Sequence, residues 1–427
     1  MESAKDFVIQ RLGDCEVPSP MRGVRFAGEK DHILLHSDLG EIRRYLDAGG
    51  EPPCFEAAGP REKIFFDPSK LVCGIVTCGG LCPGLNDVIR SIVLSLHHHY
   101  GVQAIYGFPY GYEGLAPKFG YEPVMLTPQA VVNINEVGGT MLGSSRGNQD
   151  VGVMVDTLER MKIGILFCIG GDGTQRGALA ISEEARRRGL KLSVIGIPKT
   201  IDNDISFVQM TFGFETAVSE AKRATDAAHS EAAGARNGIG LVKLMGRDSG
   251  FIAAFSVLVD NKVNFCLIPE VPFTLDGLLT ALKQRLERRG HAVIVVAEGA
   301  GQELIETTGE RDASGNIKYG DIGTLLRDRI REHFKRSGME ISLKYIDPSY
   351  MIRSQQANPH DSAFCLLFGH NAVHAGMAGR TGMIVGFWNH EFTHVPIPLA
   401  VSQRKKIDPE GRIWSSVLAS TGQPAVM

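Results

Sequence analysis

Short apolar runs that end in glycine-rich polar loops recur along this chain. The clearest run is 163–169, which passes directly into the segment GGDGT at 170–174. A run this short and this apolar, ended by glycines, predicts a parallel strand that is buried on both faces. The glycines would let a phosphate chain approach main-chain N–H groups without a Cβ in the way. The alternative interpretation is an ordinary glycine-rich turn with a surface aspartate.

The same pattern predicts further strands and helices along the chain. Other apolar runs predict strands at 71–77, 192–197, 238–245 and 292–297. Helical periodicity predicts helices at 87–96, 151–161 and 175–188. A chain that alternates strand, polar loop and helix predicts an α/β fold of two doubly wound, Rossmann-like domains, with the active site in the cleft between them.

We place the boundary between the two domains near residue 212. The first domain is expected at 71–212 and the second at 213–427, with part of 354–427 returning to the first domain. Residues 1–70 are rich in Pro and Gly and show no sustained period. They predict an N-terminal extension that wraps the domain or serves an interface.

Composition narrows the class of protein. A chain of 427 residues exceeds what one hydrophobic core usually holds. A hydrophobic content of 43% and a net charge of −3 suit a globular enzyme and offer no basic field for nucleic acid. No apolar run approaches the roughly 20 residues of a membrane-spanning helix. The eight scattered cysteines are typical of reduced thiols, so we expect a cytoplasmic protein.

Two more loops have the composition of phosphate-binding segments. The strand at 71–77 ends in CGGLCPGLN at 78–86 before a predicted helix, an arrangement that presents a helix N-terminus to an anion. It is not a Walker A motif, because no Gly-Lys-Ser/Thr follows. The loop GGTMLGSSRG at 138–147 carries Arg146, whose planar guanidinium can reach phosphate oxygens. A solvated surface arginine is the alternative.

Carboxylates mark two of the strand ends. An acidic side chain beside bound phosphates, as Asp172 would be, implies a Mg²⁺ ion between them. The strand at 192–197 runs into PKTIDND at 198–204, and in an extended loop Asp202 and Asp204 would point the same way. One could act as a base while the other meets or orients a cation. Lys199 could hold the pair ionised or meet phosphate, and a plain acidic turn is the alternative.

The second half of the chain carries a similar set of loops. GRDSGF at 246–251 follows the strand at 238–245, and Glu298 follows the strand at 292–297. Lys344, Tyr350 and Arg353 lie near one another in the sequence. These residues place cations and a carboxylate in the second domain.

The motifs together resemble one family. GGDGT alone is shared with NAD kinases and lipid kinases. Together with CGGLCPGLN, GGTMLGSSR, PKTIDND, MGRDSGF, AEG and the Tyr350/Arg353 pair in the same order, it makes residues 71–410 resemble the 6-phosphofructokinases. PKTIDND, the N-terminal extension and DPSYMIR are similar to the long-chain branch, which includes trypanosomatid and plant ATP-dependent enzymes and related pyrophosphate-dependent ones.

The resemblance implies a reaction and a set of roles. The reaction is transfer of a phosphoryl group to O1 of fructose 6-phosphate in glycolysis, with Asp202 as general base, Asp172 as Mg²⁺ ligand, and Thr200, Arg146 and Arg247 in the catalytic set. The implied nucleotide contacts are Gly79, Gly80, Arg146, Gly147, Gly171, Asp172, Gly173, Thr174 and Lys199, with Ser314, Gly315 and Asn316 added from the trypanosomatid branch. The implied sugar-phosphate contacts are Thr200, Ile201, Asp202, Met245, Gly246, Arg247, Glu298, Lys344, Tyr350, Met351, Ile352 and Arg353.

The resemblance leaves the phosphoryl donor as a choice between ATP and pyrophosphate. Pyrophosphate-dependent members typically carry Asp at the position of Gly173 and Lys at that of Lys199, whereas bacterial-type ATP enzymes have Gly at both. The mixed pair favours ATP with Mg²⁺, because Gly173 leaves room for a nucleotide. Pyrophosphate is the alternative donor, and a NAD or lipid kinase, which would not need PKTIDND or MGRDSGF, is a remote one. A silent regulatory subunit would be expected to lack Asp202 or Asp172.

The resemblance also implies how the enzyme works in the cell. We expect an allosteric homo-oligomer, a dimer or tetramer, in which Lys344 serves the site of a neighbouring subunit. Its partners are expected to be fructose 6-phosphate and ATP, without nucleic acid or membrane.

Overall fold

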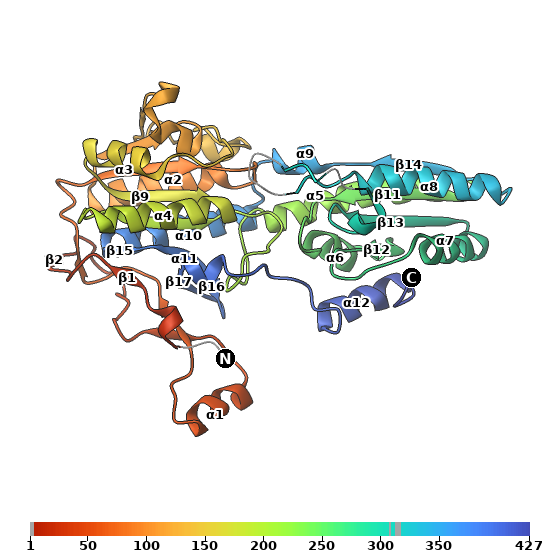
Figure 1. The fold of residues 1–427 in the computed structure, drawn as a ribbon, viewed down its shortest axis with the longest axis horizontal. Coiled ribbons are helices and arrows are strands. Elements are labelled where there is room, and N and C mark those ends of the chain that lie inside the picture. The colour runs from red at the N-terminus through yellow and green to blue at the C-terminus, as the bar shows by residue number, and fades with distance from the viewer. Residues whose placement is uncertain (1–3, 307–308, 312–316) are drawn as a thin grey trace. The chain divides into compact units, whose positions relative to one another are not determined.

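The computed structural model describes residues 4–306, 309–311 and 317–427. The chain folds into two compact units (Figure 1). Unit 1 holds Met1–Thr200, Ile205–Gly213 and Ser354–Gln403, and unit 2 holds Ile201–Asp204, Phe214–Arg353 and Arg404–Met427. Thus both the segment after residue 353 and the short PKTIDND loop divide between the units. No helix in the described part of the chain has the length and apolar character needed to cross a membrane.

Unit 1 is built on a nine-stranded mixed sheet. Its order is β3 (His32–Leu34), β4 (Cys54–Ala57), β17 (Glu391–Pro396), β16 (Met383–Trp388), β10 (Ser193–Pro198), β9 (Ile163–Gly170), β6 (Val72–Thr77), β7 (Ala104–Phe108) and β8 (Val124–Met125). The five strands from β16 to β7 are parallel, and antiparallel strands extend the sheet on both sides. Two small sheets pair β1 (Gln10–Arg11) with β15 (Arg380–Thr381) and β2 (Val17–Pro18) with β5 (Lys63–Ile64).

Helices cover both faces of this sheet (Figure 1). On β9, Leu166 and Cys168 pack in one cluster with Ala178 of α4 (Asp172–Arg187) and with residues of α3 (Val151–Arg160). Ile165 points to the other face, where a Cβ on Gly376 of α10 (Pro359–Met377) would come within 2.9 Å of it. Beside α10 lies α2 (Leu85–Ser95), which continues as a π-helical turn over Leu96–Tyr100. The remaining helices of unit 1 are α1 (Leu39–Asp47) and α11 (Ile397–Ala400).

Unit 2 has a four-stranded parallel sheet. Its order is β12 (Phe265–Leu267), β13 (His291–Ala297), β11 (Gly238–Leu244) and β14 (Ser342–Ile346). The helices α7 (Leu275–Arg289) and α8 (Ile322–Arg336) share a core with Ile239 and Leu241 of β11. On the other face Gly240 lets α5 (Phe214–Ala233) approach, since a Cβ there would lie 2.8 Å from that of Ala228. The unit is completed by α6 (Phe251–Leu258), α9 (Ser349–Arg353) and α12 (Arg412–Thr421).

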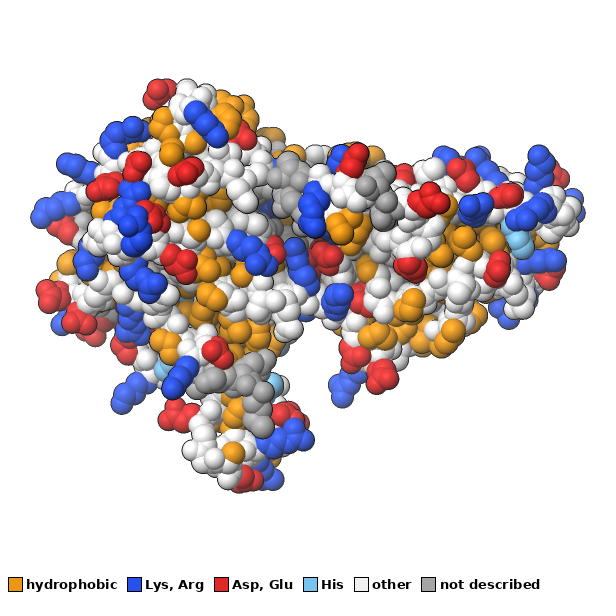
Figure 2. Space-filling model, viewed as in Figure 1, with side chains coloured by type: hydrophobic (Ala, Val, Ile, Leu, Met, Phe, Trp, Pro, Cys, Tyr) orange, Lys and Arg blue, Asp and Glu red, His pale blue; other side chains and the backbone are white. Residues whose placement is uncertain are grey.

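Both units therefore have the doubly wound, Rossmann-like α/β architecture that the sequence pattern predicts, and the five predicted strands all form. The prediction was wrong about the start of α4, which begins at Asp172 rather than at residue 175. The antiparallel edge strands were not predicted. On the face drawn in Figure 2, acidic and basic side chains are interspersed over each unit.

Residues 4–70 are joined to the rest of unit 1 by a buried ionic cluster around Glu56, which is 7% exposed. Its carboxylate accepts hydrogen bonds from Arg61 at 2.9 Å, from Arg380 at 2.9 Å and from Arg11 at 3.1 Å, and it lies 3.2 Å from Nδ1 of His394. Burial opposes ionisation of Glu56, but the hydrogen bond to His394 and the charges of His394, Arg380 and Arg61 outweigh it and hold its pKa far below the ordinary value.

Replacing Glu56 with Gln should lower the free energy of unfolding by about 3–5 kcal/mol, because the arginines stay buried after their counter-charge is removed. Because the pKa of Glu56 is lowered by folding, this stabilisation is present above the ordinary carboxyl pKa and is lost as the pH falls below it. Urea unfolding at several pH values measures both effects. The control is Glu41→Gln, which removes an exposed ion pair with Arg44 and should cost less than about 1 kcal/mol. Equal stability of the two variants at neutral pH would contradict the prediction.

Candidate active site

Three predicted phosphate-binding segments of unit 1 lie at the carboxyl ends of neighbouring strands. The loop at 78–84 follows β6, the start of α4 follows β9, and Lys199 follows β10, and these three strands are adjacent in the sheet. Because the strands are parallel, their carboxyl ends share one edge of the sheet. The sheet thus brings together residues that are more than 100 positions apart in the chain.

Main-chain hydrogen bonds join the loop after β6 to the loop that carries Arg146. The N–H of Gly79 donates to the carbonyl of Ser145 at 2.9 Å, and the Ser144 hydroxyl donates to the carbonyl of Gly79 at 2.6 Å. Gly79 has a φ of +86°, a conformation that L-amino acids with a side chain seldom adopt. Arg146 follows directly and is exposed. The two predicted loops therefore form one structure.

The GGDGT segment is the N-terminus of α4 rather than a loop. Gly171 is the N-cap residue, and no side chain caps this end of the helix in the described structure. The first-turn N–H groups therefore face the loop edge of the sheet, where an anion can accept their hydrogen bonds. Asp172 is the first helical residue, and a Cβ on Gly173 would meet nothing within 4 Å, so open space lies in front of it.

Lys199 links the ends of β9 and β10 to the loop after β6. Its ammonium donates to the carbonyl of Gly80 at 2.6 Å, and its N–H donates to the carbonyl of Gly170 at 3.0 Å. The residue is only 7% exposed. Part of its role is therefore to hold the glycine loop in place.

The donor atoms around Asp172 fit a magnesium ion that is bound mainly by a ligand's phosphates. Among the described residues, no group of three or more His, Cys, Asp or Glu side chains could hold a metal by itself. Mg²⁺ commonly takes one or two carboxylates, several waters and substrate phosphate oxygens. Asp172, whose carboxylate also lies 3.2 Å from the guanidinium of Arg176, supplies one such carboxylate.

The second group of predicted site residues gathers in unit 2, at the ends of β11 and β13. The N–H of Glu298 donates to the carbonyl of Leu244 at 2.9 Å, and that of Gly299 donates to Gly246 at 3.0 Å. The N–H of Arg247 points to Oδ2 of Asp202, at 3.4 Å. Thus Asp202, Arg247 and Glu298 lie together. Met245 and Gly246 belong to the same loop.

The PKTIDND segment turns at Asn203 and is not extended as predicted. Asn203 has a φ of +55°, a left-handed conformation that asparagine tolerates better than most residues. Asp202 and Asp204 are therefore not alternate residues of an extended strand, for which the side chains would point the same way. Asp202 and Asp204 nevertheless interact, since the charge of Asp204 acts on Asp202.

Burial and neighbouring carboxylates perturb the ionisation of this site. Desolvation raises the pKa of Asp202 well above the ordinary value, and the charges of Asp204 and Glu298 raise it further, against the effect of Arg247 and Arg404. Burial also raises the pKa of Glu298, and the charges of Arg247, Lys243 and Arg353 partly offset this rise. A carboxylate with a raised pKa accepts a proton more readily than an ordinary one.

Other predicted sugar-phosphate residues differ in exposure. The Arg247 guanidinium stacks 4.3 Å from the ring centroid of Tyr319, and that of Arg353 lies 4.8 Å from the ring centroid of Tyr350. On α9, Tyr350 and Met351 are exposed, whereas the Ile352 side chain is fully buried and could reach a ligand only through its backbone. Lys344 is exposed in the middle of the edge strand β14, away from the strand ends that carry Arg247 and Glu298.

The predicted contacts Ser314, Gly315 and Asn316 lie outside the described residues. Three further residues of this region were not predicted from the sequence: Tyr319, Arg404 and Lys243, which lies 2.8 Å from Asp347. The basic run at 404–406 was visible in the sequence, but a run of this kind usually marks a solvated surface.

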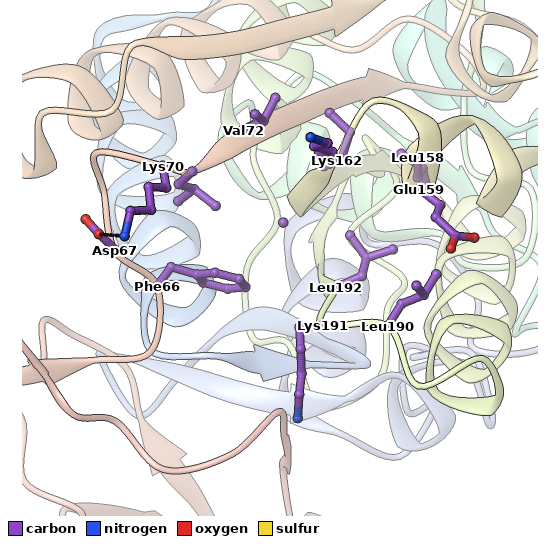
Figure 3. Close-up of a pocket in the computed structure, with 13 residues that line it drawn as sticks. Phe66, Asp67, Lys70, Val72, Leu158, Glu159, Lys162, Leu190, Lys191 and Leu192 are labelled. Carbon is purple, nitrogen blue, oxygen red and sulfur yellow. Dashed lines mark ion pairs between the residues drawn. The ribbon is translucent and has the colours of Figure 1, made fainter.

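A separate hollow of about 320 Å³ lies at the opposite, N-terminal ends of β6 and β9 in unit 1 (Figure 3). Phe66 and Leu192 line it, and Lys70 forms an ion pair with Asp67 at its rim, at 3.3 Å. This hollow is therefore distinct from the phosphate-binding loops.

Glycine loops and an uncapped helix N-terminus in one unit, and a carboxylate–arginine cluster in the other, define a two-domain α/β protein that handles phosphate compounds. Residues 72–376 match the phosphofructokinase family. The chain belongs to this family.

Curated relatives match nearly the whole chain. The chain is 50% identical to the ATP-dependent 6-phosphofructokinase of Borreliella burgdorferi, and the match covers 99% of this chain and 98% of the relative. It is 45% identical to the ATP-dependent 6-phosphofructokinase of Trypanosoma cruzi, over 97% of this chain and 87% of the relative. A solved pyrophosphate-dependent phosphofructokinase from Marinobacter aquaeolei superposes with a TM-score of 0.68 over 82% of this chain and 91% of that one. The two sequences are 19% identical, so this similarity supports the fold alone.

Gly79→Ala should have a larger effect than an alanine substitution at another glycine that has a left-handed φ. The left-handed φ should cost about 1–2 kcal/mol of stability for a residue with a Cβ, and that Cβ would also lie 3.3 Å from the Lys199 ammonium. The control is Gly101→Ala, since Gly101 has a φ of +78° but open space around its Cβ position. Both variants should lose stability in thermal unfolding, but only Gly79→Ala should weaken binding of ATP, used as the probe in calorimetry. Equal ATP affinity in the two variants would contradict this account of the loop.

Proposed function

We propose that this chain transfers the γ-phosphoryl group of ATP to O1 of fructose 6-phosphate, giving fructose 1,6-bisphosphate and ADP. The observation that carries the proposal is the position of Asp202, a carboxylate of raised pKa beside Arg247 and Glu298. The full-length similarity to enzymes named ATP-dependent 6-phosphofructokinases supports both the acceptor and the donor.

The residues of unit 1 are proposed to bind the donor. The proposed contacts of the nucleotide phosphates are Gly79, Gly80, Arg146, Gly147, Gly171, Gly173, Thr174 and Lys199. Backbone N–H groups at the start of α4 suit phosphate oxygens. We assign Asp172 to a Mg²⁺ ion, which when bound offsets negative charge on the phosphates.

The residues of unit 2, with Thr200, are proposed to bind the acceptor. The proposed contacts are Thr200, Ile201, Asp202, Met245, Gly246, Arg247, Glu298, Tyr350, Met351, Ile352 and Arg353. Arg247 and Arg353 carry the positive charge that a sugar phosphate needs, and Glu298 can accept hydrogen bonds from sugar hydroxyls. Lys344, exposed on the edge strand β14, is proposed to serve a neighbouring subunit in a dimer or tetramer.

The proposed chemistry is an in-line displacement. As the bond from O1 to the γ-phosphorus forms and the bond from that phosphorus to the bridging oxygen breaks, Asp202 takes the proton of the O1 hydroxyl. Arg146 offsets charge on the transferring group. Arg247 and Arg353 bind the 6-phosphate of the sugar and so align the O1 hydroxyl. Binding energy from one end of the sugar thus promotes the reaction at the other end.

Pyrophosphate remains the second candidate donor, because Lys199 is the residue that pyrophosphate-dependent members keep. The open space in front of Gly173 supports ATP, because a bulkier donor has room there. All eight cysteines are free, which agrees with a proposed location in the reducing cytoplasm.

A coupled assay of the purified protein with fructose 6-phosphate tests the proposal. Turnover is expected with Mg²⁺ and ATP, and kcat/KM for pyrophosphate is expected to be far lower. A higher kcat/KM for pyrophosphate than for ATP would overturn the assignment of the donor, and no turnover with either would overturn the function.

Asp202→Asn should lower kcat by about 10²–10⁴-fold while the KM for fructose 6-phosphate stays similar, because the amide keeps the shape but accepts no proton. In the wild type, kcat/KM should rise with pH as Asp202 loses its proton, and its raised pKa places this rise above the usual range of aspartate. The variant should lose the rise. Wild-type kcat in Asp202→Asn would show that another group is the base.

Gly173→Asp should reduce kcat/KM for ATP much more than it weakens binding of fructose 6-phosphate. The new carboxylate fits the open space but would repel a phosphate about 4 Å away by about 4 kcal/mol at an effective dielectric of 20. Gly173→Asn is the control of equal size, and it should retain most of the ATP-dependent activity. If Asn and Asp impair the use of ATP equally, then size rather than charge is responsible.

A further inference from the structure

Residues 404–407 of unit 2, which we call the strap, contact the turn that carries Asp202. The Arg404 guanidinium donates to Oδ2 of Asp204 at 2.5 Å, and the N–H of Lys405 donates to the Asp204 carbonyl at 2.9 Å. Asp204 is only 2% exposed, so its charge has little contact with water. A buried carboxylate of this kind depends on its cation partner.

The other end of the strap contacts the loop that carries Arg247. The N–H of Ile407 donates to Oε1 of Glu270 at 2.9 Å, and both carboxylate oxygens of Glu270 accept from the N–H of Gly250 at 3.0 Å. Gly250 ends this loop and caps α6. Glu270 therefore joins the strap to the 245–250 loop.

The strap is anchored on both sides. The Lys405 ammonium lies 5.2 Å from the ring centroid of Phe251, the first residue of α6. After the strap, Trp414 of α12 is 3% exposed, and α12 packs on α6. Gln423 accepts from the Cys266 N–H at 2.6 Å and donates to its carbonyl at 3.2 Å. The contact with Phe251 thus holds the strap against the start of α6, and the contacts of Trp414 and Gln423 fix the segment that follows the strap.

Arg404 is the permanent positive charge at this end of the site. Burial lowers the pKa of Lys405 to about 7, against a smaller opposing effect of Asp204, so the charge of Lys405 varies near neutrality. A guanidinium stays protonated throughout this range. Around Asp202, the charges of Asp204 and Glu298 oppose its ionisation, whereas the charge of Arg404 and the hydrogen bond from the Arg247 backbone N–H favour it.

We propose that Arg404 is a positioning residue, which neutralises Asp204 so that Asp202 can lose its proton near neutral pH, and that the strap fixes the Asp202 turn relative to the Arg247 loop. This inference rests on the proposed function. It assigns to Arg404, which is far from the PKTIDND motif in the sequence, an effect on the protonation of the base Asp202.

The test compares Arg404→Gln, which removes the charge and leaves a shorter, neutral polar side chain, with Arg404→Lys, which keeps a charge. In Arg404→Gln, the acidic limb of the kcat/KM profile should move to higher pH by roughly half a unit to one unit. Activity at pH 7 should fall by up to ~10-fold and recover at higher pH. Arg404→Lys should restore most of the wild-type profile. The control is Arg412→Ala, which removes an exposed charge from the same C-terminal segment and should leave the profile unchanged.

A second measurement separates this proposal from the proposed function. Infrared titration of the carboxyl band that disappears in Asp202→Asn reports the protonation of Asp202 without turnover. That band should titrate at higher pH in Arg404→Gln than in the wild type, whether or not fructose 6-phosphate is the substrate. An unchanged or lowered titration midpoint in Arg404→Gln would overturn the role of Arg404. A wild type inactive towards fructose 6-phosphate, with the band shifted as expected, would overturn the function alone.

Discussion

Burial of the central parallel strands on both faces is the constraint on which the rest of the structure depends. Residues 165–169 of β9 and 194–197 of β10 are buried, so neither strand can carry a charged side chain along this length. Polar chemistry is therefore confined to the strand ends. The parallel direction then places the carboxyl ends at one edge, where the glycine loop, the start of α4 and Lys199 meet.

The same constraint explains how much of the fold could be predicted. A long buried strand such as β9 leaves an uninterrupted apolar run in the sequence, and the polar residues at its end mark the loop. The edge strands β8 and β3 leave no such trace, because they have only two or three residues and exposed side chains. The start of α4 was misplaced because its glycines disfavour a helix, although they are tolerated in the first turn.

The residues of the candidate site likewise fall into those that could be predicted from the sequence and those that could not. The loop residues Gly79, Asp172 and Arg247 could be found because each follows a recognisable strand or motif. Arg404 could not, because its partner Asp204 lies 200 residues earlier and only the folded chain brings them together. A basic run gives no sign in the sequence of whether its charges face water or a buried carboxylate.

Charge balance links these observations. In unit 2 the carboxylates Asp202, Asp204 and Glu298 share a poorly hydrated region, so each needs compensation. In the proposed complex the sugar phosphate binds Arg247 and Arg353. The negative charge of the phosphate then reduces the electrostatic stabilisation that these arginines give to the carboxylates. Arg404 is held by Asp204 and is not among the proposed ligand contacts, so its charge stays with the acidic cluster when the substrate binds. The ionisation of Asp202 while a sugar phosphate is bound therefore depends on a cation that this phosphate does not engage.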